Sequence, residues 1–253
     1  MNKTEPRSTD QPVGVIEDAV RRLRGAIMTG DLRPGQKLVE AELCADLDIS
    51  RASLREALRA LEGERLIELV PNRGPSVAKL GLKEIEDIHD VWAMLTSEAV
   101  TRFTELATAK DIAEIEVITA RLRRALKAKN AIEQLNATNE FFGYILLKCG
   151  NNVLIDVVAL LVSRLNFLRA QALMHEGWSA LCSQEFDAMV AAIRSKKPTA
   201  ARRAMQRHVE SACEAATHVA LLPKPAAGAR KQATHIKPVG MTRWNGRARA
   251  ARS

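Results

Sequence analysis

Arginines in the stretch ISRASLREALRALE, residues 49–62, have the spacing that one face of a helix requires. Arg51, Arg55 and Arg59 recur every four residues, so on a helix they project from the same side. The opposite side is apolar and is formed by Leu54, Ala57, Leu58 and Leu61. Guanidinium groups donate hydrogen bonds to anions and to the acceptor edges of nucleobases. The stretch therefore predicts a helix that docks on a core and binds an anionic partner.

The elements around this helix predict a helix-turn-helix with a small wing. Amphipathic helices are expected from Val13 to Thr29 and, more briefly, from about Glu40 to Leu47. The short linker DIS then leads into the arginine-bearing helix, where Ser50 is placed to cap the N-terminus. Beyond Gly63, the segments RLIELVP and PSVAKL flank the turn NRG and predict a β-hairpin. This order of elements indicates a winged helix-turn-helix over residues 13–80.

The rest of the ordered chain, residues 81–222, shows only helical periodicity. It predicts an antiparallel all-α bundle of about six helices, so the fold class as a whole is mainly α. The expected helices are about 83–106, 110–129, 131–149, 152–172, 183–195 and 199–222. Residues 79–81, between the wing and the first bundle helix, are the expected hinge.

The net charge of +8 is concentrated at the C-terminus. Residues 223–253 carry eight lysines and arginines and no acid, and they are rich in Pro, Gly and Ala. This composition predicts a basic disordered tail, and residues 1–12 are expected to be a flexible N-terminus. The other 222 residues balance 30 basic against 30 acidic side chains. Specific binding must therefore come from the position of individual charges rather than from their sum.

Several functional classes lack their sequence signatures. No segment is long and apolar enough for a membrane span, so we expect a cytoplasmic protein without a membrane partner. The four cysteines are widely spaced and form no C-x-x-C pair, which predicts reduced thiols. The chain contains no nucleophile elbow and no phosphate-binding loop, so we expect neither an enzyme nor a bound cofactor.

The stretch AIMTGDLRPGQKLVEAELCADLDISRASLREALRALEGERLIELVPNRGPSV resembles the GntR family of transcriptional regulators. The motif CGNNVL and the run from Glu185 to His208 resemble the FCD (fatty-acid-regulator) branch of that family. The resemblance implies a ligand-responsive regulator, most often a repressor, that binds a short palindromic DNA operator as a homodimer. A small-molecule effector would bind inside the bundle.

The resemblance and the helix geometry together give a set of candidate DNA contacts. They are Ser50, Arg51, Ser53, Arg55, Arg59, Arg73 and Gly74. Arg51 and Arg55 are the expected principal contacts, and the helix N-terminus is expected to hold phosphate. Arg59 lies farther along the helix and is alternatively only a solvated charge. Gly74 lies at the wing tip near the minor groove, although a tight turn would also favour glycine there.

Many members of the FCD branch hold a divalent metal with an aspartate and three histidines, and the metal helps to bind a carboxylate-bearing effector. The matching positions here are Thr138, Phe142, Phe186 and His208, so only the last ligand is retained. A single histidine cannot form a firm metal site, and we therefore predict no metal. Trp92 stands where the family tends to carry an effector-binding arginine.

These substitutions predict an aromatic interior. Trp92, Phe142 and Phe186 would surround an apolar or aromatic effector, with Thr138 and His208 as polar anchors. His208 is alternatively a hydrogen-bonded core histidine. A second hypothesis is that the phenylalanines fill the space completely. The protein would then be a DNA-binding protein of the same fold that has lost effector control.

Overall fold

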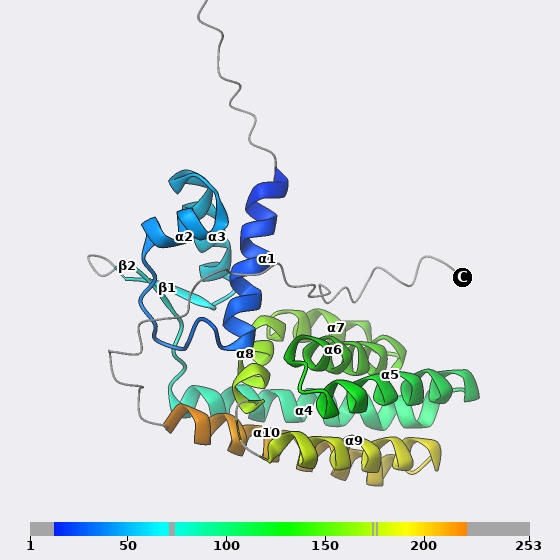
Figure 1. The fold of residues 1–253 in the computed structure, drawn as a ribbon. Coiled ribbons are helices and arrows are strands. Elements are labelled where there is room, and N and C mark those ends of the chain that lie inside the picture. The colour runs from blue at the N-terminus through cyan, green and yellow to red at the C-terminus, as the bar shows by residue number, and fades with distance from the viewer. Residues whose placement is uncertain (1–12, 71–73, 174, 176, 222–253) are drawn as a thin grey trace, which may run out of the picture.

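The computed structural model describes residues 13–70, 74–173, 175 and 177–221 (Figure 1). The described helices are α1 Val13–Thr29, α2 Glu40–Leu47, α3 Arg51–Gly63, α4 Leu82–Leu106, α5 Ala109–Lys127, α6 Ala131–Lys148, α7 Asn152–Ala159, α8 Val162–Ala172, α9 Trp178–Arg194 and α10 Pro198–Leu221. The strands are β1 Ile67–Val70 and β2 Gly74–Val77. The predicted mainly α fold with a small hairpin is confirmed. The predicted flexible N-terminus and basic tail lie outside the described residues.

The N-terminal unit is the predicted winged helix-turn-helix. The apolar side of α3 is fully buried against α1 through residues such as Leu54 and Leu61, which are 0% exposed. The wing strands pair antiparallel, with Ile67 opposite Val77. The segment after α1 joins this sheet through a bridge between Lys37 and Ser76. Burial of one side of α3 leaves its other side free to face outward.

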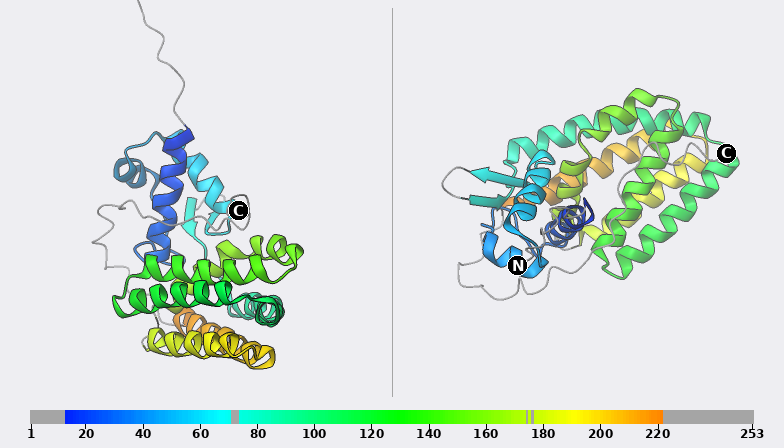
Figure 2. Two further views of the ribbon diagram at one scale, coloured as in Figure 1. Left: turned by 90° about the vertical axis from the view of Figure 1, so that its right-hand side faces the viewer. Right: turned by 90° about the horizontal axis from the view of Figure 1, so that it is seen from above.

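The C-terminal unit is an antiparallel helical bundle on which the N-terminal unit rests. Helices α4 and α10 run side by side, and α9 and α10 form the layer farthest from α1 (Figures 1 and 2). Helix α1 stands on the bundle and contacts α6 and α8. Buried apolar residues of both units belong to one continuous core. No described helix is both long enough and apolar enough to cross a membrane.

The bundle differs from the sequence prediction at two places. The predicted helix 152–172 is two helices, because the amides of Leu160 and Leu161 bond three residues back, to Val157 and Val158, and end α7. Helix α9 begins at Trp178, whereas residue 183 was expected. The described bundle therefore contains seven helices rather than about six. Neither boundary carries a proline that would have marked it.

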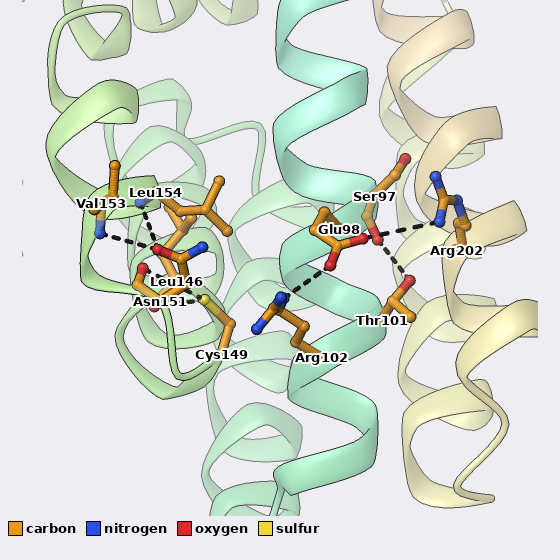
Figure 3. A network of polar contacts seen from close by, with 10 residues as sticks. All are labelled: Ser97, Glu98, Thr101, Arg102, Leu146, Cys149, Asn151, Val153, Leu154 and Arg202. Carbon is orange, nitrogen blue, oxygen red and sulfur yellow. Dashed lines mark hydrogen bonds and ion pairs between the residues drawn. The ribbon is translucent and has the colours of Figure 1, made fainter.

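Polar contacts hold the bundle helices in register (Figure 3). Glu98 of α4 forms ion pairs with Arg102 of the same helix at 2.8 Å and with Arg202 of α10 at 3.9 Å. Asn151 caps α7 by accepting a hydrogen bond from the Val153 amide at 3.1 Å. The Asn151 cap fixes where α7 begins, and the exposed pair of Glu98 with Arg202 adds a polar link between α4 and α10.

Asp111 joins α5 to α6 through a buried cluster of hydrogen bonds. It forms a capping box with Thr108 and accepts a hydrogen bond from the Tyr144 hydroxyl at 2.7 Å. Lys148 lies 3.6 Å from the same carboxylate. Burial alone would raise the pKa of Asp111, but the bonds from Thr108 and Tyr144 and the charge of Lys148 lower it to about 2. The ionised carboxylate therefore stabilises the bundle at neutral pH.

We expect Asp111→Asn to lower the free energy of unfolding by about 2 kcal/mol at pH 7. Because the folded-state pKa lies below the ordinary 3.8, this contribution is complete above that value and is lost as the pH falls toward 2. The difference between variant and parent should shrink to roughly 1 kcal/mol at pH 3. Urea unfolding of the variant and the parent between pH 7 and pH 3 measures this difference in the free energy of unfolding. The exposed Glu105→Gln is the control, and a difference that does not vary with pH would contradict the assignment.

Candidate nucleic-acid interface and interior cavity

The N-terminus of α3 is closed by the predicted cap. The Ser50 hydroxyl accepts a hydrogen bond from the Ser53 amide at 3.1 Å, and the two hydroxyls lie 2.9 Å apart. Ser53 is buried, so its hydroxyl lies beneath the helix surface and is engaged with Ser50. The exposed polar side chain of this first turn is Arg51.

All three arginines of α3 are exposed, as their spacing predicted. Arg55 is held by Glu40 of α2, whose carboxylate accepts hydrogen bonds from Nε at 3.2 Å and from Nη2 at 3.1 Å. Arg51 and Arg59 form no ion pair within the part of the chain that the structure describes. The pair with Glu40 orients Arg55 on the outer face of the helix-turn-helix.

The wing and the far end of α3 complete this surface. Gly74 pairs with Val70 and has a φ of +75°, so the turn itself requires a residue that tolerates this conformation. Arg73 lies outside the described residues.

At the C-terminal end of α3, Glu64 accepts hydrogen bonds from Nε and Nη2 of Arg24 in α1. This bidentate pair fixes the direction in which α3 points.

The bundle brings together the positions that the sequence singled out. The rings of Phe142 and Phe186 lie 5.9 Å apart, and the ring of His208 lies 6.0 Å from the first and 4.7 Å from the second. The ring of Trp92 packs edge-on against Phe142 at 5.1 Å. Trp92, Thr138 and His208 line a cavity in the bundle, whereas the predicted effector residues Phe142 and Phe186 are buried beside it and are not among its lining residues. The Nδ1–H of His208 donates to Glu185 at 2.9 Å. An aromatic cluster therefore occupies the centre of the bundle.

Two family models match this chain in succession. The model for bacterial regulatory proteins of the gntR family matches residues 15–77, and the FCD domain model matches residues 87–211. Together they cover most of the described residues and coincide with the two structural units.

The chain belongs to the GntR family. An HTH-type transcriptional regulator of Agrobacterium vitis, from the TAR-I ttuE-ttuC' intergenic region, is 30% identical over 54% of this chain and 81% of its own length. The HTH-type transcriptional repressor GlaR of Escherichia coli is 28% identical over 55% of this chain and 66% of its own length. The crystal structure of a GntR regulator from Rhodococcus sp. RHA1 matches with a TM-score of 0.65 at 19% identity, covering 82% and 98% of the two chains. This GntR protein is a DNA-binding transcriptional regulator and not an enzyme.

In this GntR protein, Phe142, Phe186 and His208 converge as metal ligands would, but two of the three cannot bind a metal. The rings at these three positions lie 4.7 to 6.0 Å apart. Three histidines at this separation could bind one metal ion with bonds of about 2 Å, but the phenylalanine rings have no atom that can bind a metal. Among the described residues, no group of three or more histidines, cysteines, aspartates and glutamates could hold a metal. His208 instead bonds Glu185, as expected for a core histidine.

Sequence reasoning missed Arg169 of α8, which reaches into the aromatic cluster. Its Cζ lies 5.1 Å from the centre of the Trp92 ring and 4.9 Å from that of Phe142. Arg169 lines the same cavity as Trp92 and His208. The expected aromatic interior with Thr138 and His208 as its polar groups therefore also contains a cation. An arginine inside the apolar stretch LNFLRAQAL was the signal that could have revealed it.

Two further titratable groups of the cavity, Cys182 and His89, are neutral at pH 7. Burial raises the pKa of the Cys182 thiol, so it is no thiolate nucleophile. Burial lowers the pKa of His89, whose Nδ1–H donates to the Ile85 carbonyl at 2.8 Å. Arg169, by contrast, is a cationic group of this cavity.

We expect the triple variant Thr138→Asp, Phe142→His and Phe186→His to gain the metal site that the parent lacks. With His208 it would supply four ligands around one point, and Zn²⁺ at a hundredfold excess over its Kd should raise Tm by roughly 5–10 °C. Thermal unfolding with and without Zn²⁺ measures this effect.

The parent and the variant with an additional His208→Ala change serve as controls for the triple variant. Zn²⁺ should leave the melting temperature of the parent unchanged. Equal stabilisation of the parent by Zn²⁺, reversed by a chelator, would show that other residues of the chain bind the metal.

Proposed function

We propose that this protein is a repressor that binds a palindromic operator as a homodimer and responds to a small molecule bound in its bundle. The observation that carries the DNA-binding part is the outward face of α3. Arg51 and Arg55 are exposed on it, while the opposite side of the helix is buried against α1. A helix mounted in this way can enter the major groove and donate bidentate hydrogen bonds to guanine. Because its operator would be chromosomal, we place the protein in the cytoplasm.

An exposed apolar stripe on α7 supports the homodimer. Val153, Val157 and Leu160 follow one another at helical spacing and are 67%, 38% and 81% exposed. The opposite side of α7 is buried through Ile155 and Val158. A helix that is apolar on both sides is normally covered on both. A second copy of the chain would cover the stripe and supply the second α3 that a palindrome requires.

Helix α8 supports a link between the cavity and the DNA-binding unit. The Ser163 hydroxyl donates to Glu64 at 3.5 Å, beside the pair that Glu64 forms with Arg24. The same helix carries Arg169 in the cavity. An effector that moves α8 would therefore change the support beneath the C-terminal end of α3. Residues 79–81 form the covalent hinge, with Gly81 as the first residue before α4.

The small size of the cavity favours a second candidate function. Its volume is about 30 Å³, which suits roughly one or two water molecules. A regulator of this fold without effector control would have such a filled interior. Stabilisation of the folded protein by a ligand separates the two candidates, because binding to the folded state alone raises Tm.

We expect Arg55→Ala to weaken binding to the selected operator by about 1–3 kcal/mol, the value of one bidentate guanine contact. Selection from a random DNA pool identifies the operator, and a gel-shift titration at fixed salt measures the loss. Arg102→Ala removes an exposed arginine of the bundle and should leave affinity unchanged. Unaltered operator choice and affinity in Arg55→Ala would show that α3 does not read DNA as proposed.

We expect Leu160→Glu to convert the dimer into a monomer, because it places a charge on the most exposed residue of the apolar stripe. Sedimentation velocity measures the change in mass. Val117→Glu introduces the same charge on α5, where the parent side chain is 56% exposed, and should leave the dimer intact. If Val117→Glu dissociates the dimer while Leu160→Glu leaves it intact, the dimer interface does not include the apolar stripe of α7.

A further inference from the structure

The two structural units of this protein carry no net charge, whereas the segment that follows them is basic. Residues 13–80 contain 11 lysines and arginines and 11 aspartates and glutamates, and residues 81–222 contain 17 of each kind. Residues 223–253 contain eight lysines and arginines and no acid. The winged helix therefore lacks the net positive charge that attracts duplex DNA independently of sequence.

Several arginines of the winged helix are also engaged by its own carboxylates. An arginine that is paired with a carboxylate attracts phosphate less than a solvated arginine does, because the two charges offset each other. Residues 223–253 are therefore the strongest candidate for a sequence-independent attachment to DNA. The engaged pairs are Arg21 with Asp18, Arg24 with Glu64 and Arg55 with Glu40.

The basic segment begins at the end of the bundle where α4 begins. Helices α4 and α10 run antiparallel. Arg202, near the start of α10, lies 3.9 Å from Glu98 of α4. Cys213, farther along α10, lies within range of the charge of Glu86, which is nearer the start of α4. The same register brings Leu221, the last residue of α10, level with the start of α4 (Figure 1).

The segment is long enough to reach DNA that is bound to the winged helix. Leu82, the first residue of α4, follows Val77 of β2 by five residues, so the two lie within about 18 Å of each other. A unit of the size of the winged helix is roughly 30 Å across. The 31 residues of the segment can span up to about 100 Å. They can therefore pass the winged helix and contact phosphates beside the bases that α3 would face.

Acidic side chains beside α10 are the alternative partner of this segment. Glu86, Asp90 and Glu214 are exposed and lie within electrostatic range of Cys213. Exposed ion pairs with single carboxylates contribute little, because they are screened and restrict both side chains. Duplex DNA instead carries one phosphate charge about every 1.7 Å and releases counterions when these charges are neutralised. Eight basic side chains therefore match duplex DNA better than they match these carboxylates.

We propose that residues 223–253 form a second DNA-binding segment, which contacts the phosphates of duplex DNA beside the operator independently of sequence. This inference goes beyond the proposed recognition of an operator by α3. The segment holds the neutral winged helix near DNA, and operator choice stays with α3. Because phosphate contacts carry no base information, the segment raises affinity for operator and non-operator DNA alike.

The test is the salt dependence of binding to a long duplex of random sequence, measured by fluorescence anisotropy with the full chain and with a variant that lacks residues 223–253. Each phosphate contact contributes about 0.9 to the slope of log K against log salt concentration. Deletion should therefore lower the slope by about 4–7 per chain, for roughly four to eight contacts. At about 50 mM salt the affinity for this duplex should fall at least tenfold.

Two variants of full length assign the effect to charge. Exchange of the eight lysines and arginines of the segment for glutamine should have the same effect as the deletion. A segment of the same composition in scrambled order should bind as the parent does, because phosphate contacts do not depend on the order of the residues. The melting temperature of each variant should equal that of the parent, since residues 13–221 are unchanged.

Four results would overturn the proposal. The first is an unchanged salt slope in both the deletion and the glutamine variant. The second is a higher DNA affinity after deletion, which would indicate that the segment binds the acidic side chains beside α10. The third is stronger competition by single-stranded RNA than by duplex DNA of equal length. The fourth is a different operator selected from a random pool by the deletion variant, which would show that the segment reads bases.

The Arg55→Ala variant in the same titrations separates this inference from the proposed function. If deletion leaves the salt slope unchanged while Arg55→Ala loses operator preference, the second segment fails and the proposed role of α3 stands. If deletion lowers the slope while Arg55→Ala keeps its operator preference, the second segment stands and the proposed role of α3 fails.

Discussion

The structure depends on the burial of α1 between the recognition helix and the bundle. Leu23 is 0% exposed, and α1 packs against α3 on one side and against α6 and α8 below. Arg24, on the next position of α1, pairs with Glu64 at the end of α3. One helix therefore fixes the direction of α3 and its attachment to the bundle at the same time. The two units are thus joined by packed side chains as well as by the connecting chain.

The DNA-binding unit could be predicted from the sequence because its determinants are local. Four-residue spacing of arginines, an apolar opposite face and a capping serine all lie within one short segment. The buried position of Ser53 could not be predicted in the same way, since it depends on how the first turn of α3 meets its neighbours. The break between α7 and α8 was equally hidden, because the leucines at that point fit a continuous helix.

The cavity was predicted only in part, for a related physical reason. Phe142, Phe186 and His208 could be placed together because the resemblance fixed their spacing. Arg169 comes from a different helix, and its meeting with Trp92 and Phe142 results from the way α4, α6 and α8 pack.

The ion pair between Arg55 and Glu40 has a consequence for discrimination between DNA sequences. Exposed pairs of this kind are worth about 0–1 kcal/mol, whereas a bidentate guanine contact is worth about 1–3 kcal/mol. If Arg55 left Glu40 for a single solvated phosphate, the binding free energy would therefore change little. If Arg55 left Glu40 for a guanine, the binding free energy would become more favourable. Under the proposed contact of Arg55 with guanine, the carboxylate of Glu40 would therefore disfavour non-specific sites more than the operator.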